Sequence, residues 1–110
     1  MKIDQNSKYT LLHADEENIK VFLEKLNNEL HNLKKENIIV TFSDNFKRKK
    51  EDFLLFLDIA AHKKELGTSF VLVNKEINAD DYPEDFNIVP TLTEAEDILD
   101  METMERELGF

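Results

Sequence analysis

The sequence contains no cysteine and no tryptophan, and only two glycines and two prolines occur among its 110 residues. The absence of cysteine excludes a disulfide framework, a thiol nucleophile and a thiolate metal site. No tract resembles a linker, so the length predicts a single domain over residues 1–110. The apolar runs are far shorter than the roughly 20 residues that span a bilayer. Residues 1–9 lack the apolar segment of a signal peptide, and we therefore expect a cytoplasmic protein that does not bind membranes.

Acidic charge is concentrated in the last third of the chain. The net charge is -10; residues 1–75 hold 13 basic and 12 acidic side chains, whereas residues 76–110 hold 12 acidic side chains and a single base, Arg106. Proteins that bind nucleic acid usually present the opposite charge, so we do not expect a nucleic-acid partner. The acidic third is either a solvated face that maintains solubility or a match for a basic protein surface.

Short apolar runs alternate with longer amphipathic segments. Strands are predicted at residues 2–5, 8–14, 37–43, 69–75 and 87–91. The third and fourth are almost continuously apolar, which is typical of strands covered on both faces. Strands that alternate with helices indicate an α/β fold with right-handed crossovers. We predict a single, mostly parallel sheet of four or five strands, with an antiparallel hairpin at its N-terminal edge and three main helices.

The three helices are predicted from apolar residues at helical spacing. The first covers residues 15–35 with Asp15 as its N-cap, and the second covers residues 51–67 and stops at Gly67. The third begins near Thr93, which forms a T-x-x-E capping box with Glu96. Its apolar positions, which we expect to lie in the core, are Ala95, Ile98, Leu99 and Leu108.

Residues that could carry chemistry show no catalytic or metal-binding spacing. His13, His31 and His62 lie on different predicted elements, and the acidic loop at residues 77–86 lacks the glycine and the spaced glutamate of a calcium loop. No glycine-rich phosphate loop and no G-x-S-x-G motif occurs. We predict that the protein is not an enzyme and uses no cofactor or metal.

One basic block, Lys47, Arg48, Lys49 and Lys50, precedes the second predicted helix. Four cations repel one another there and oppose the helix dipole, and only a few acidic side chains are near, so local stability does not explain the block. It can be a solvated turn, a nucleic-acid patch or a protein contact. The nucleic-acid interpretation is weak because Phe46 and Phe53 are expected in the core and no aromatic ring is free to stack.

Three segments together resemble a STAS domain, the fold of the SpoIIAA-type anti-sigma factor antagonists. They are IIVTFSDNF at residues 38–46, SFVLVNK at residues 69–75 and TLTEAEDIL at residues 91–99. In that family, a loop after the central strand carries an Asp-Ser-Ser-Gly motif with a phosphorylatable serine. Here Lys49 and Lys50 stand at the positions of its aspartate and that serine, and Glu51 and Asp52 stand at the next two. A serine-kinase switch is therefore not expected at this loop, and Ser43 is the nearest hydroxyl that could replace it.

The resemblance implies a regulatory domain that binds a partner protein through this loop and the helix after it. The residues that would make the contact are Lys47, Arg48, Lys49, Lys50 and Glu51. Two alternatives remain open: a module that binds a small anion, lipid or nucleotide, and a companion of an enzyme such as ribonuclease Z that has no nuclease chemistry of its own. A homodimer, in which the basic block meets the acidic third of a second copy, is also open.

Overall fold

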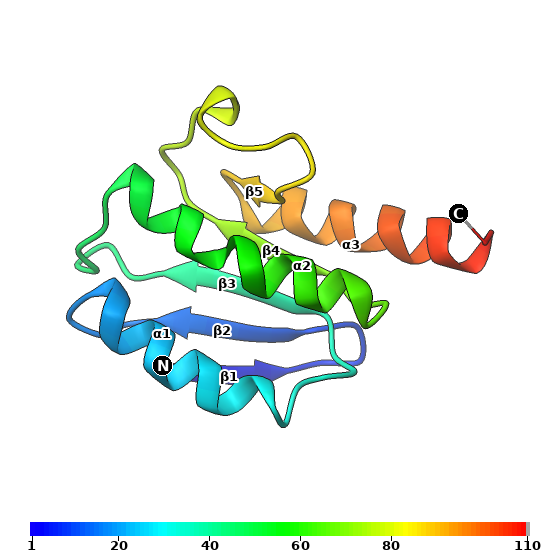
Figure 1. Cartoon of the computed structure of the whole chain (residues 1–110), viewed down its shortest axis with the longest axis horizontal. Coiled ribbons are helices and arrows are strands. Elements are labelled where there is room, and N and C mark those ends of the chain that lie inside the picture. Colours follow the sequence, from blue (N-terminus) through cyan, green and yellow to red (C-terminus); the bar gives the residue numbers. More distant parts are fainter. Residues whose placement is uncertain (110) are drawn as a thin grey trace.

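A five-stranded mixed sheet organises the computed structural model, which describes residues 1–109 (Figure 1). The strands are β1 (Lys2–Gln5), β2 (Thr10–Ala14), β3 (Ile38–Phe42), β4 (Phe70–Val73) and β5 (Ile88–Val89). They lie side by side in chain order; β1 is antiparallel to β2, and the other neighbours are parallel. The predicted α/β fold, with its antiparallel N-terminal edge, is confirmed.

Helices fill the connections and close the chain. They are α1 (Ile19–Leu30), the 3-10 helix η1 (Lys50–Phe56), α2 (Leu57–Glu65), the short 3-10 helix η2 (Ala79–Asp81) and α3 (Leu92–Glu107). The second predicted helix thus starts as a 3-10 helix that continues into α2, and Gly67 follows it with a φ of 77°, as expected of a helix stop. Within residues 1–109, no helix has the length and apolar character to cross a membrane.

Side chains alternate between the two faces of the sheet. On one face, Leu12, Val40 and Leu72 pack against residues of α1, η1 and α2. Phe22 of α1 belongs to an aromatic cluster there, and its ring centroid lies 6.1 Å from those of Phe42, Phe46 and Phe56. On the other face, Ile39 and Val71 pack against α3. Because β3 and β4 contribute buried side chains to both faces, both are covered, as their apolar sequences predict.

The start of α1 differs from the prediction. Its N-cap is Asn18, whose Oδ1 accepts a hydrogen bond from the Val21 backbone N at 3.0 Å. Asp15 instead accepts from the N-terminal amine at 2.8 Å, and Asn18 forms a bridge with Lys47. These contacts keep residues 15–18 outside the helix. The helix also ends earlier than predicted, at Leu30.

The start of α3 is shifted in a similar way. Thr91, and not Thr93, is the N-cap, and its Oγ1 accepts from the Glu94 backbone N at 3.1 Å. The motif T-x-x-E occurs twice in succession, and the earlier copy leaves Glu96 free to accept from the Tyr9 hydroxyl at 3.0 Å. Leu99 is buried as predicted, but Leu108 is 66% exposed, so its predicted place in the core is wrong.

Candidate functional site

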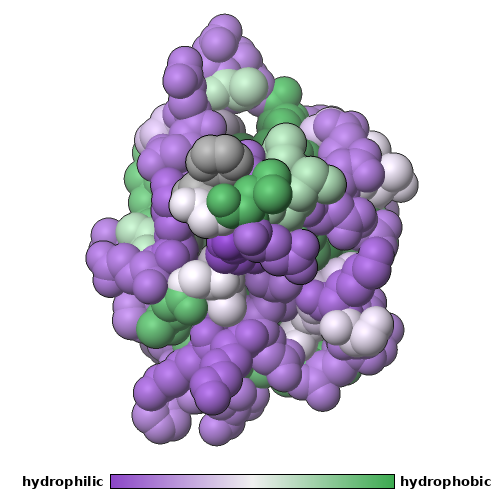
Figure 2. Space-filling model, turned by 90° about the vertical axis from the view of Figure 1, so that its right-hand side faces the viewer, coloured by the Kyte–Doolittle hydropathy of each residue, from purple (hydrophilic) through white to green (hydrophobic). Residues whose placement is uncertain are grey.

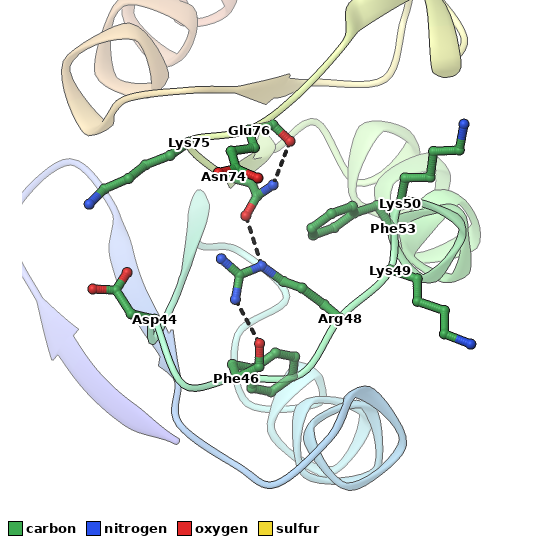
Figure 3. A pocket seen from close by; sticks show the side chains of 9 residues that line it. All are labelled: Asp44, Phe46, Arg48, Lys49, Lys50, Phe53, Asn74, Lys75 and Glu76. Carbon is green, nitrogen blue, oxygen red and sulfur yellow. Dashed lines mark hydrogen bonds between the residues drawn. The ribbon is translucent and has the colours of Figure 1, made fainter.

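The basic block lies at the carboxyl ends of the parallel strands, where ligands commonly bind in open α/β sheets. The loop of residues 43–49 follows β3, and residues 74–78 follow β4. Between these two loops lies a hollow of about 470 Å³ (Figure 3). It is lined by Asp44, Phe46, Arg48, Lys49, Lys50, Phe53, Asn74, Lys75 and Glu76. The fold therefore brings the block together with polar residues that end the next strand.

Arg48 holds the two loops together. Its Nε donates to Asn74 Oδ1 at 2.8 Å, and its Nη1 donates to the carbonyl oxygens of Ser43 at 3.0 Å and Phe46 at 2.9 Å (Figure 3 shows the bonds to Asn74 and Phe46). Its guanidinium carbon also lies 5.4 Å from the centroid of the Phe42 ring, a geometry that favours a cation–π contact. The expectation that local stability does not explain the block is therefore wrong for Arg48.

The three lysines behave differently, because their side chains are exposed. In Figure 3, the side chains of Lys49 and Lys50 point away from the guanidinium and out of the hollow. The backbone beneath them is nevertheless anchored: Lys49 N donates to Asp52 Oδ2 at 2.8 Å, and Lys50 O accepts from the Tyr82 hydroxyl at 3.0 Å. The lysine side chains are thus presented from a fixed loop.

The predicted contact residues consequently fall into two groups. Lys47, Lys49, Lys50 and Glu51 are exposed, whereas Arg48 is half-buried and engaged within the fold. Only one ion pair involves these five residues in the described part of the chain, between Lys50 Nζ and Asp81 Oδ1 at 3.9 Å. Both partners are partly solvated there, so the pair contributes at most about 1 kcal/mol.

Asn74, Lys75 and Tyr82 are site residues that sequence reasoning missed. Asn74 is 7% exposed, and its Nδ2 also donates to the Glu76 carbonyl at 3.0 Å. The sequence did contain a signal for Asn74 and Lys75, because this polar pair ends an otherwise apolar strand segment. Burial, followed by the charges of Asp81 and Glu51, raises the pKa of Tyr82, whose ring packs edge-on against Phe53 with centroids 6.3 Å apart.

A second hollow, of about 590 Å³, adjoins the first on the side of α3. The two share Asp44, Arg48, Asn74 and Lys75, and the second extends to Pro90, Thr91 and Leu92. Two of the guanidinium nitrogens of Arg48 bond within the protein, whereas Nη2 makes no hydrogen bond to the described residues. Lys75 also lines both hollows, as does the carboxylate of Asp44. A guanidinium nitrogen and an ammonium group are donors suited to a carboxylate or phosphate oxygen.

The histidines remain apart in the structure. His13 is on β2, where its Nδ1 lies 2.7 Å from Thr41 Oγ1, His31 follows α1, and His62 is exposed on α2. Among residues 1–109, no three histidine or carboxylate side chains are grouped so that they could hold a metal ion. No protein-family model matches the sequence, and a search of curated proteins found no match either.

Proposed function

We propose that this protein is a STAS-like regulatory domain that acts by binding a partner protein and has no catalysis of its own. The binding surface is the lysine surface, which we define as Lys47, Lys49, Lys50, Glu51, Leu54 and Leu55. The observation that carries the proposal is that the residues of the basic block have two different environments. Arg48 fixes the loop from within, and the lysines beside it project into solvent.

Exposed leucines beside the lysines support a protein contact over a solvated turn. Leu54 and Leu55 of η1 are 41% and 54% exposed, while their neighbours Phe53 and Phe56 are buried. Solvation of a turn explains exposed lysines, but it does not explain exposed leucines next to them. Protein interfaces, in contrast, combine an apolar centre with a polar rim. The partner that fits is an apolar patch bordered by carboxylates, since opposite charges steer association and set its specificity.

The regulatory part of the proposal rests on the STAS resemblance. The three segments that carry the resemblance form β3 with the loop after it, β4, and the start of α3, and this order supports the proposal. The loop lacks a hydroxyl at the family's phosphorylated position. The nearest one, Ser43 Oγ, accepts from the Asn45 backbone N at 3.3 Å, and the Ser43 carbonyl accepts from Arg48. Partner binding is therefore proposed to be constitutive at this loop.

The test compares two triple variants of the tagged full chain. In one, Lys47, Lys49 and Lys50 are changed to Ser; in the matched control, Lys20, Lys34 and Lys35, which are also exposed, are changed to Ser. Both should fold normally. Partners cross-linked in the native cell extract and quantified by mass spectrometry should be lost with the first variant and retained with the second. If every captured protein is retained equally by both, the lysine surface is a solvated turn.

A second candidate function is the binding of a small anion, favoured by Arg48 Nη2 and Lys75 at the shared part of the two hollows. Native mass spectrometry of gently purified protein distinguishes it from the first. A bound phosphate- or carboxylate-containing compound that is lost in a Lys75→Met variant supports the anion. A co-purifying protein that survives this substitution supports the lysine surface.

A further inference from the structure

The inner side of α3 is fixed to the sheet by apolar and polar contacts. Ala95 and Leu99 are 0% and 3% exposed. Further along the helix, Glu102 Oε1 accepts from Ser69 Oγ at 2.6 Å, and Arg106 Nη2 donates to the same hydroxyl at 3.1 Å. These helix residues are spaced by four, three and four, so they share one side of α3. The contacts that fold the domain therefore come from this side.

A second apolar row occupies the opposite side of the helix. Met101, Met104 and Leu108 are 55%, 60% and 66% exposed, and they follow one another at intervals of three and four residues. We call this row the outer seam. Figure 1 shows that this half of α3 extends beyond the ends of the strands. Figure 2, which looks at that end of the molecule, shows an apolar patch surrounded largely by hydrophilic residues. Folding does not account for these side chains.

The outer seam has the spacing of a coiled-coil interface. With Met101 at heptad position a, Met104 falls at d and Leu108 at the next a. Positions e and g, which border such an interface, are then occupied by Asp100, Glu105 and Glu107, and all three are exposed. Within the described chain, only Asp100 has a basic partner, Lys8, at 3.7 Å between two largely solvated side chains. The outer seam is therefore an apolar row with acidic side chains on both sides.

From this arrangement we propose that the outer seam of α3 is a docking site for a basic amphipathic helix of another protein. Apolar residues at a and d of the partner would cover the outer seam, and Lys or Arg at its e and g positions would meet the three carboxylates. Methionine suits this role because its unbranched, polarizable side chain adapts to different neighbours. The proposal is independent of the lysine surface, from which it differs in location and in the charge it attracts.

A second copy of the chain fits the outer seam less well. If two α3 helices paired through their seams, every bordering position would bring carboxylate toward carboxylate, and like charges at e and g positions disfavour pairing. The excess of acidic residues on α3, with seven acidic side chains against the single base Arg106, has the same effect. Charge therefore selects a basic partner and disfavours the pairing of two outer seams.

The probe for the test is a labelled synthetic helix of about three heptads, with Leu at a and d and Lys at e and g. The control peptide carries Glu in place of Lys, and binding to the full chain is followed by fluorescence anisotropy. We expect the basic peptide to bind and the acidic one not to bind. Changing Met101→Ser together with Met104→Ser should weaken binding by about tenfold or more, since two apolar side chains no longer contribute to the contact.

Two further variants make the result specific. Ile3→Ser with Leu66→Ser alters two exposed apolar residues elsewhere, at 46% and 43% exposure, and should bind the basic peptide like the unmodified chain. Asp100→Lys, Glu105→Lys and Glu107→Lys together should reverse the preference, so that the acidic peptide binds. Circular dichroism confirms that each variant is folded.

Three results would overturn the proposal. One is equal binding of the basic peptide by the unmodified chain and the methionine variant, and another is no binding by the folded, unmodified chain. The third is self-association of the unmodified chain, measured by sedimentation, that the methionine substitutions abolish. That result would identify a second copy as the occupant. The first two outcomes do not involve Lys47, Lys49 or Lys50, so in those cases the two proposals fail separately. In the third case, a Lys47, Lys49 and Lys50→Ser variant shows whether the second copy docks through its lysine surface.

Discussion

The two faces of the sheet are covered by cores of very different size. Among residues 1–109, sixteen buried residues form the core beneath α1, η1 and α2, and phenylalanine rings fill much of it. Beneath α3, five residues of the same range form the buried core: Tyr9, Ile39, Val71, Ala95 and Leu99. There, polar contacts at both ends of the helix supplement the apolar ones, from Tyr9 to Glu96 and from Ser69 to Glu102.

The difference indicates which face contributes most to stability and which helix keeps an apolar surface exposed. The face of the sheet that α1, η1 and α2 cover, which we call the aromatic face, buries the larger side chains, so most of the hydrophobic stabilisation arises there. α3 buries a narrow row and leaves its opposite side apolar and exposed. Substitutions on the aromatic face should therefore affect folding most, and substitutions at the outer seam should affect binding with little effect on folding.

The largest expected effect is that of Phe22→Ala on the aromatic face. Phe22 is fully buried and meets three other phenylalanine rings, so a cavity would replace many contacts. We expect the free energy of unfolding to fall by about 3–5 kcal/mol. Denaturant titration followed by circular dichroism measures it. A loss smaller than that of Leu99→Ala would contradict the ranking of the two faces.

On the α3 face, Leu99→Ala removes the largest aliphatic side chain that this helix buries. We expect a loss of about 2–3 kcal/mol, at the lower end for such substitutions, because little apolar structure surrounds the site. Met104→Ser on the same helix provides the control, since this exposed side chain should change stability by no more than about 0.5 kcal/mol. If the two variants unfold at the same denaturant concentration, α3 is not packed as described.

Lys63 is a cation buried on the aromatic face, and its substitution should have an intermediate effect. It is 2% exposed, and its Nζ donates to the carbonyl oxygens of Leu33 at 2.7 Å, Lys34 at 3.3 Å and Glu36 at 2.6 Å. The side chain thereby ties α2 to the turn that follows α1. Changing Lys63→Met retains most of the volume but leaves the carbonyl groups without this donor. We expect a loss of about 1–3 kcal/mol in thermal or chemical unfolding at neutral pH.

The same residue predicts a dependence on pH. Burial lowers the pKa of Lys63 from 10.5 to about 8, although the negative charge of Glu36 acts in the opposite direction and raises it. Between these two values the unfolded chain binds more protons than the folded one, so the free energy of unfolding should rise as the pH increases from about 8 to 10.5. The rise should be smaller in the Lys63→Met variant, which serves as control for other groups that titrate there. Identical pH profiles would show that Lys63 does not titrate differently in the two states.

In the basic block, the expected effects on stability differ between Arg48 and the three lysines, and the lysines give the smallest effect. Arg48→Ala removes three hydrogen bonds and the contact with Phe42, and should cost about 1–3 kcal/mol. Arg48→Lys should restore little, because lysine lacks the planar fork of donors. The triple Lys47, Lys49 and Lys50→Ser variant should stay within about 0.5 kcal/mol of the unmodified chain. Equal destabilisation by the Arg48 and lysine variants would contradict this division.

The sequence identified the basic block, but its role in binding stays a prediction. Lys47, Arg48 and Lys49 lie on the loop after β3, and Lys50 and Glu51 begin η1. The different role of Arg48 could not be predicted, because its acceptor Asn74 is 26 residues away and reaches it only when β3 and β4 pair. The anchoring of Lys50 by Tyr82 likewise joins residues 32 positions apart.

What the sequence by itself determined is the alternation of strands and helices, since hydrophobic periodicity is a local property of the chain. The buried strands β3 and β4 and the burial of Leu99 follow from it. The stop at Gly67 follows from another local property, the ability of glycine to adopt a positive φ. Only the tertiary structure decided which of two equivalent capping motifs starts α3, because Glu96 is needed by Tyr9. It also decided that Leu108 is exposed, because the side of α3 that faces the sheet carries Ala95, Leu99, Glu102 and Arg106, and Leu108 lies on the opposite side.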